Sequence, residues 1–180
     1  KGMAVALTTT LNTGFGSGVV ASGILLNNEM DDFAAVPGSA NGYGLVQGEP
    51  NAIAPGKRML SSMSPTIVTG PDGQVRLVAG AAGGPTIITS VFEEISNVLD
   101  FGLDTRRAVL APRFHMQHLP DTVTIETGGL LTGTRQNLES MGYAFSERQH
   151  IADAPMIGRE GSQWVGVAEP RREGSLAAGP

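Results

Sequence analysis

The stretch from Val75 to Leu99 reads VRLVAGAAGGPTIITSVFEEISNVL, and its pattern changes halfway. Its first part, Val75 to Ala79, is apolar, and a second apolar run, Thr66 to Thr69, lies on the other side of Pro71-Asp72-Gly73. A turn of this kind between two apolar runs predicts a β-hairpin. After Gly83-Gly84 the apolar residues recur every three or four positions, which predicts an amphipathic helix.

The rest of the chain adds elements of both kinds. The further expected strands are Met3 to Thr9, Val19-Val20, Ile24 to Leu26, Val123 to Glu126, Tyr143 to Ser146 and Trp164 to Ala168. The further expected helices are one that Asp104 caps and Pro112 ends, and one over Thr134 to Met141. No internal repeat or linker divides the chain. Residues 1–180 are therefore predicted to form a single α+β domain, with helices covering one face of an antiparallel sheet.

Composition excludes several classes of function. The 180 residues are 41 % hydrophobic and 16 % charged, as in ordinary soluble globular proteins. The formal net charge is −5 and the basic residues are scattered, so we expect neither a nucleic-acid partner nor direct membrane contact. The chain has no cysteine, which excludes disulfides, thiolate metal sites and a cysteine nucleophile. It also shows no signal-peptide pattern and no apolar run long enough to span a membrane.

Three acids, Glu29, Asp31 and Asp32, follow Asn27-Asn28 and precede a long loop rich in Gly, Pro and Asn. Two carboxylates this close can hold a primary ammonium, act as a general acid/base pair, or bind Ca²⁺ or Mg²⁺. A solvated acidic turn would have the same sequence. The residues alone leave these alternatives open.

Two further motifs supply hydrogen-bond donors. Gly83 and Gly84 stand before the predicted helix, where unpaired backbone amides can stabilise an oxyanion, although a plain turn would also need glycine. Ser61 and Ser62 offer hydroxyls for a carboxylate, or mark an ordinary polar entry to a strand. The spacing of His115 and His118 does not fit a zinc protease helix, so we expect no metal and no cofactor.

Taken in order, these motifs resemble the small subunit of the γ-glutamyltranspeptidases, a family of N-terminal-nucleophile hydrolases. The similar strings are TLNTGFGSG, SGILLNNEMDDF, NGYGLVQGEPNAIAPGKRMLSSMSPTIV, AGAAGGPTIIT, APRFHMQHLPD and AEPRREGSLAAG. The resemblance implies half of a four-layer αββα sandwich, whose other half is a large subunit cut autocatalytically from the same zymogen. It also implies a heterodimer whose catalytic threonine stands shortly before Lys1, outside this sequence.

The resemblance also assigns roles by position. Thr10 matches the residue that hydrogen-bonds the nucleophile, and Gly83 and Gly84 match the oxyanion-hole pair. The substrate α-amino group would bind Asn12, Glu29 and Asp32, and its α-carboxylate would bind Ser61 and Ser62. Residues 37–48 match a lid loop in which Tyr43 walls the γ-glutamyl pocket. Pro85 and Thr86 stand where bacterial members commonly have Ser-Arg.

The implied function is γ-glutamyl transfer or hydrolysis in glutathione metabolism, with a γ-glutamyl donor and an amine, peptide or water as acceptor. The freed α-amine of the threonine acts as its base, because an α-amine titrates near neutral pH. The alternatives are a cephalosporin or glutaryl acylase of the same fold, which needs no acids for an ammonium, and a non-catalytic γ-glutamyl-binding homologue. By family analogy the protein is expected to be periplasmic or secreted, with a cytoplasmic location as the alternative.

Overall fold

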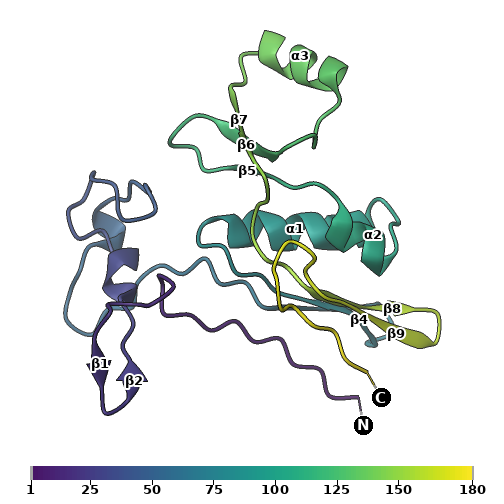
Figure 1. The fold of residues 1–180 in the computed structure, drawn as a ribbon, viewed down its shortest axis with the longest axis horizontal. Coiled ribbons are helices and arrows are strands. Elements are labelled where there is room, and N and C mark those ends of the chain that lie inside the picture. Colours follow the sequence, from purple (N-terminus) through teal and green to yellow (C-terminus); the bar gives the residue numbers. More distant parts are fainter. Residues whose placement is uncertain (1, 180) are drawn as a thin grey trace. The chain divides into compact units, whose positions relative to one another are not determined.

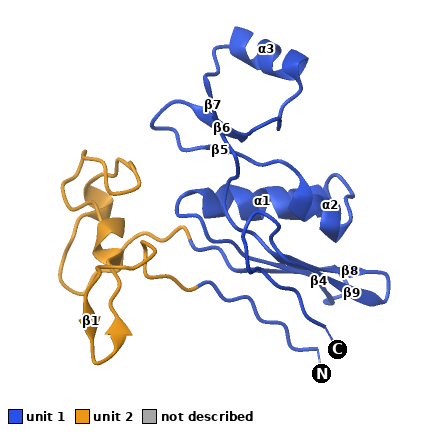
Figure 2. Ribbon diagram, in the orientation of Figure 1, with its two compact units in different colours: residues 1–8, 63–180 blue, residues 9–62 orange. Residues whose placement is uncertain are grey.

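The computed structural model describes residues 2–179, and they form two compact units, coloured separately in Figure 2. Unit 1 comprises residues 1–8 and 63–180, and unit 2 comprises residues 9–62. Compact units of this size can belong to one domain, so the single-domain organisation stays a prediction.

Unit 1 is built on a four-stranded antiparallel sheet in the order β3-β4-β8-β9. Its strands are β3 (Thr66–Thr69), β4 (Val75–Ala79), β8 (Met156–Glu160) and β9 (Gln163–Val167). Helices α1 (Thr86–Leu99) and α2 (Thr105–Leu110) lie along the sheet (Figure 1). The predicted β3–β4 hairpin and both helices are confirmed, as is the Asp104 cap, whose Oδ1 accepts a hydrogen bond of 2.7 Å from the Arg107 amide.

The core lies between this sheet and α1. Ile87 and Val91 stand one helical turn apart, so both face the sheet and pack against buried Leu77 and Met156. Val109 of α2 belongs to the same cluster and is fully buried. The opposite side of α1 is exposed, with Phe92 65 % accessible, which is what a helix on the surface of one sheet produces.

A second, three-stranded sheet and a third helix follow in unit 1. They are β5 (Phe114–Met116), β6 (Val123–Glu126), β7 (Phe145–Arg148) and α3 (Thr132–Ser140). The β6 prediction is confirmed, and β7 and β9 lie close to their predicted ranges. Two expectations are wrong: β6 and β7 pair in parallel, and β5 and β8 are strands that the sequence patterns did not indicate. The parallel pair arises because α3 carries the chain back to the start of β6.

The expected strand from Met3 to Thr9 does not form. The segment has the alternation of a strand, with Met3, Val5 and Leu7 at least 70 % exposed and the residues between them half-buried. Within the described residues, however, no ladder of backbone hydrogen bonds pairs it with another segment. The pattern is therefore that of a strand, but the pairing is absent.

Unit 2 has little regular structure. Two short strands, β1 (Val20–Ala21) and β2 (Ile24–Leu25), lie close to their predicted ranges and pair as a hairpin. The unit also contains two 3₁₀ turns, η1 (Glu29–Asp32) and η2 (Glu49–Asn51). The rest is loop held by side-chain to backbone hydrogen bonds, as expected where Asn and Gly are frequent.

Candidate active site

The three acids lie on the 3₁₀ turn η1, directly after β2. The turn starts at Asn28, and the Asn27 side chain accepts a hydrogen bond of 3.0 Å from the Glu29 amide. A single tight turn places Glu29 and Asp32 on the same side, because residues three apart overlap in a 3₁₀ helix. Their carboxyl groups lie within hydrogen-bonding reach of each other.

Both carboxyl groups are harder to ionise than free acids. Burial raises the pKa of Glu29, and the neighbouring Asp32 raises it further. Burial also raises the pKa of Asp32, with Asp31 adding to the rise and the hydrogen bond with Glu29 opposing it. Glu29 Oε1 is buried and has no hydrogen-bond partner among the described residues. An ammonium group bound to this half-buried pair would supply both a positive charge and hydrogen-bond donors.

Asn12 is tied to this acidic turn. It has a left-handed backbone, with φ of 74°, and its amide donates to Thr10 Oγ1 at 2.8 Å. Its side-chain nitrogen donates to the Asn28 carbonyl at 3.2 Å, while the Asn28 amide donates to the Leu11 carbonyl at 3.1 Å. These hydrogen bonds fix the Thr10-to-Asn12 segment beside the start of η1.

Tyr43, in the loop of residues 37–48, contacts the same cluster. Its hydroxyl donates to the Asn12 carbonyl at 2.8 Å, joining the middle of residues 37–48 to the Thr10-to-Asn12 segment. Burial raises the pKa of Tyr43, and the charges of Asp32, Glu29 and Asp31 raise it further, in that order. The phenol therefore stays a donor at neutral pH, with the acids close enough to affect it.

Residues 37–48 are folded back on themselves. The amide of Gly38 donates to the Gln47 carbonyl at 2.8 Å, and the amide of Asn41 donates to the Leu45 carbonyl at 2.9 Å. Both oxygens of Asp31 accept from the Gly42 amide at 3.1 Å, and Asn41 Nδ2 donates to the Asp31 carbonyl at the same distance. The loop is thus held to η1 through Asp31 and by a longer bond of 3.4 Å from Gln47 Nε2 to the Asp32 carbonyl, while Tyr43 ties it to Asn12.

A small open cavity of about 180 Å³ lies beneath this loop. Its lining includes Asp31, Phe33, Val36, Asn41 and Leu45, but neither Glu29 nor Asp32. The cavity is therefore separate from the acid pair.

Ser61 and Ser62 end unit 2, the first exposed and the second half-buried. They follow the irregular segment that starts at Lys57, where the Leu60 amide donates to Asn51 Oδ1 at 3.0 Å. Their contact with a substrate carboxylate stays a prediction. The same holds for the meeting of unit 2 with Gly83 and Gly84, which belong to unit 1.

Gly83 and Gly84 form the turn that leads from Ala82 into α1. Gly84 has a φ of 57°, and a Cβ at Gly83 would come within 2.6 Å of Thr86 Oγ1 and 2.9 Å of Ala152 Cβ. Glycine is therefore favoured at Gly84 by the backbone conformation and at Gly83 by the lack of space for a Cβ. Among the described residues neither amide donates a hydrogen bond, so both are available to an oxyanion.

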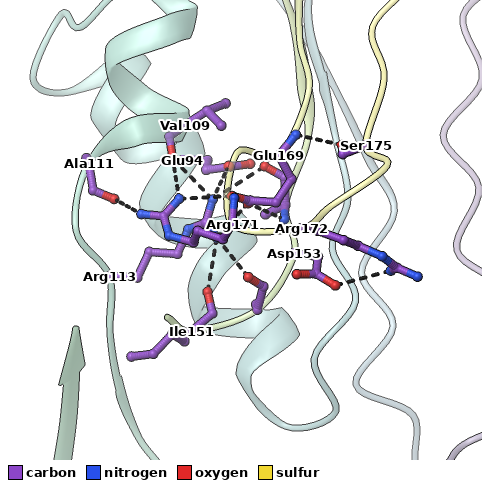
Figure 3. Close-up of polar contacts among 12 residues, drawn as sticks. Glu94, Val109, Ala111, Arg113, Ile151, Asp153, Glu169, Arg171, Arg172 and Ser175 are labelled. Carbon is purple, nitrogen blue, oxygen red and sulfur yellow. Dashed lines mark hydrogen bonds and ion pairs between the residues drawn. The ribbon is translucent and has the colours of Figure 1, made fainter. Parts of the chain in front are cut away.

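This turn is supported by the segment before β8. Ala82 and Asp153 form an isolated antiparallel bridge, with hydrogen bonds of 2.8 and 2.7 Å between their backbones. The supporting segment is held in turn by Arg113, whose Nη1 donates to the carbonyls of Ile151 at 3.0 Å and Ala152 at 3.2 Å (Figure 3).

Arg113 belongs to a buried network of arginines and acids that sequence patterns did not reveal. Its guanidinium pairs with Glu94 of α1 and with Glu169, each at 2.9 Å, and Figure 3 shows these three side chains converging. Arg171 joins Glu169 to Glu126, whose two oxygens accept from it at 2.7 and 2.8 Å. The sequence around Pro112-Arg113 does not indicate a buried ion pair, because the acid partners of Arg113 are distant in sequence.

Burial affects the acids of this network differently. It raises the pKa of Glu94 to about 8, and Arg113 opposes the rise. Burial also disfavours the charged form of Glu169, but the amides of Ala154 and Arg171, with Arg113, outweigh it and lower the pKa. Nearby Glu93 has its pKa raised to about 7, mainly by burial, although it accepts a hydrogen bond from the Phe114 amide.

The histidines are dispersed. His115 is buried and contacts Thr89 Oγ1 at 2.9 Å and Gln117 at 3.0 Å, whereas His118 and His150 are exposed. Across residues 2–179, no three acidic or histidine side chains gather as a metal site would require. Over the same residues, no helix has the length and apolar character needed to cross a membrane.

Comparison with known proteins gives consistent matches. Residues 1–179 match the family model described as gamma-glutamyltranspeptidase. The glutathione hydrolase proenzyme of Escherichia coli (strain K12) is 50 % identical over 182 residues, covering 99 % of this chain and 31 % of that protein. This chain therefore spans about a third of the length of that curated relative.

Solved structures of the same family resemble this chain closely. A γ-glutamyltranspeptidase from Pseudomonas nitroreducens, complexed with L-DON, is 46 % identical with a TM-score of 0.89, covering 99 % of this chain and 95 % of that one. A cephalosporin acylase from Bacillus halodurans is more distant, at 26 % identity and a TM-score of 0.75, covering 92 % of this chain and 30 % of that one. The expected fold, the small-subunit part of an N-terminal-nucleophile sandwich, is confirmed by this likeness.

Proposed function

Because this chain belongs to the γ-glutamyltranspeptidase family, we propose that it is the small-subunit part of an enzyme that transfers or hydrolyses γ-glutamyl groups. The donors are glutathione-like compounds, and the acceptor is an amine, a peptide or water. The partner is a large subunit cut from the same precursor. A periplasmic or secreted location is part of the same proposal.

The observation that carries the proposal is the acid pair. Glu29 and Asp32 share a half-buried turn with raised pKa values, and Glu29 Oε1 has no hydrogen-bond partner among the described residues. The α-ammonium of a γ-glutamyl group would supply this pair with a positive charge and hydrogen-bond donors. Asn12, fixed beside the turn, would add its side chain to the same group. Ser61 and Ser62 would bind the α-carboxylate.

In the proposed reaction a threonine that precedes Lys1 attacks the γ-carbonyl carbon with its Oγ. Its own α-amine takes the hydroxyl proton and then gives it to the departing amine as the C–N bond breaks. Water or an acceptor amine afterwards attacks the acyl ester, releasing the γ-glutamyl group and restoring the threonine. Thr10 would hydrogen-bond this nucleophile, and the amides of Gly83 and Gly84 would stabilise the oxyanion of each tetrahedral intermediate.

The acid pair also separates this function from its alternatives. A cephalosporin or glutaryl acylase binds an acyl group without an α-amine, so Glu29 and Asp32 would face no cation there. A non-catalytic binding homologue would need the acids but not the amides of Gly83 and Gly84.

The test uses the full-length precursor. It should cleave itself into two subunits and release the chromophore from a γ-glutamyl anilide, while a glutaryl anilide, which lacks the ammonium, reacts poorly. Gly84→Val should fold but lose about 10²–10³-fold in kcat, the usual effect of removing one oxyanion donor. Equal rates with both anilides, or wild-type turnover by a folded Gly84→Val protein, would contradict the proposal.

A further inference from the structure

The orientation of the two amides at the Gly83-Gly84 turn depends on contacts made by the neighbouring carbonyls. A trans peptide group is planar, and its C=O and N–H point in opposite directions. The Gly83 N–H therefore points away from the Ala82 carbonyl, and the Gly84 N–H points away from the Gly83 carbonyl. Whatever binds those two carbonyls determines where the two N–H groups point.

The first carbonyl is held by backbone. Ala82 accepts a hydrogen bond of 2.7 Å from the Asp153 amide and returns one of 2.8 Å to the Asp153 carbonyl. This pair resembles a step of an antiparallel ladder, and Arg113 holds the neighbouring Ile151 and Ala152 carbonyls in place. The Gly83 N–H is thus oriented by a backbone pair, and Arg113 supports that pair only indirectly.

The second carbonyl depends on a side chain. Gly83 O accepts from the Thr86 amide at 3.2 Å, which is at the long limit for such a bond, and from Thr86 Oγ1 at 2.8 Å. The peptide between two glycines rotates with little steric resistance, because neither neighbour carries a Cβ. The shorter bond, from the hydroxyl, is therefore the main restraint on this peptide.

The hydroxyl is placed for this contact by the start of α1. Thr86 is the first residue of the helix, only 9 % exposed, and Pro85 before it has no N–H to offer the Gly83 carbonyl. Thr86 follows the N-cap Pro85, and its hydroxyl donates to a carbonyl three residues earlier, a contact that Ser and Thr side chains often make.

We propose that the Thr86 hydroxyl is a positioning group that orients the Gly83–Gly84 peptide and so aims the Gly84 N–H at the reacting carbonyl oxygen. The proposal rests on the proposed function for its catalytic meaning. Thr86 does not contact the substrate, and its effect acts only through the Gly84 amide. The charge on the oxygen develops in the transition state. A Gly84 N–H that no longer points at this oxygen should therefore reduce kcat much more than donor binding.

The test compares Thr86→Val, which keeps the shape but removes the hydroxyl, with Thr86→Ser, which keeps the hydroxyl. Both are made in the full precursor and assayed after maturation. Thr132→Val is the matched control, because Thr132 is also the first residue of a helix but is exposed. We expect kcat to fall about tenfold in Thr86→Val, less than for a deleted donor because the amide remains. KM should stay within about twofold, and Thr86→Ser and Thr132→Val should retain wild-type kcat.

An unchanged kcat in folded Thr86→Val, a change confined to KM, or a failure of serine to restore the rate would each overturn the proposal. A crystal structure of Thr86→Val separates this outcome from a failure of the proposed function. The Gly83–Gly84 peptide should be rotated, or present in two orientations, even if the wild-type protein shows no γ-glutamyl activity. A peptide that keeps its orientation without the hydroxyl would refute the positioning role regardless of activity.

Discussion

Removing the Tyr43 hydroxyl should loosen the loop of residues 37–48. The hydroxyl donates to the Asn12 carbonyl. The other anchors of the loop go to η1: the Gly42 amide and Asn41 Nδ2 bond Asp31, and Gln47 Nε2 makes a longer bond to the Asp32 carbonyl. Tyr43→Phe deletes one of these anchors and leaves the ring and the other contacts in place. Its effect therefore isolates a single hydrogen bond.

The expected size follows from the exposure of the bond. Tyr43 is 39 % exposed, so its hydrogen bond exchanges with water and contributes about 0.5–1.5 kcal/mol net. A loss of about 1 kcal/mol raises the open fraction of the loop roughly fivefold. The anchors to Asp31 and Asp32 remain, so the loop should open more often without unfolding.

The assay is limited chymotrypsin digestion, because the protease cleaves after Phe as well as after Tyr. Nicking after residue 43 or Leu45 tracks the open population when the loop recloses faster than it is cut. We expect nicking to accelerate about fivefold in Tyr43→Phe. The matched control is Tyr143→Phe, since Tyr143 is similarly exposed at 43 % but its hydroxyl makes no hydrogen bond among the described residues. Equal nicking of both variants and the wild-type protein would refute the anchoring role.

Three further changes test other parts of the structure. Asp32→Asn should weaken γ-glutamyl donor binding by about 2–4 kcal/mol, because the substrate ammonium loses a charged partner, and an unchanged donor affinity in a direct titration would contradict this. Glu93→Gln should remove a pH dependence of stability. The folded pKa of Glu93 is raised from 4.5 to about 7, so its stabilisation is full below 4.5 and is lost as pH rises through 7. One pKa unit corresponds to about 1.36 kcal/mol, so the unfolding free energy of the wild type should fall by about 3 kcal/mol relative to that of the variant between pH 4.5 and 8. Denaturant titrations at several pH values measure this difference, and the same pH dependence of stability in both proteins would contradict the prediction. Arg113→Met should destabilise the protein by about 3–5 kcal/mol, since Glu94 and Glu169 lose their shared cation, and a thermal midpoint within a degree of wild type would show otherwise.

Elements with local signals were predictable from the sequence. The β3–β4 hairpin is specified by its turn, and α1 by a periodic apolar face between two glycine stops. Strand β8 was not recognised, because Gly158 and the charged Arg159 and Glu160 break its apolar pattern, and its place comes from pairing with β4 and β9. The strand predicted from Met3 to Thr9 is wrong for the opposite reason. Its residues alternate as in a strand, but among the described residues no other segment pairs with it.

Part of the candidate site could likewise be predicted from the sequence, and part could not. The acids, Asn12 and Tyr43 could be named from the order of motifs, and the structure brings them together around η1. The chemistry of the acid pair could not be derived from residue types, because it depends on burial and on an oxygen left without a partner. The supports of the Gly83-Gly84 turn were also beyond sequence reasoning, because Asp153 and Arg113 reach it only through the folded chain.

The buried arginine network also constrains the order in which unit 1 can fold during synthesis. Arg113 comes near the middle of the given sequence, but Glu169, one of its two acid partners, is translated much later. Arg171, which neutralises Glu126, follows it by 45 residues. Until Glu169 and Arg171 have left the ribosome, packing of α1 and α2 would bury Arg113 and Glu126 without these partners. We therefore expect the nascent chain to remain open, and within reach of chaperones, until the segment after β9 has emerged.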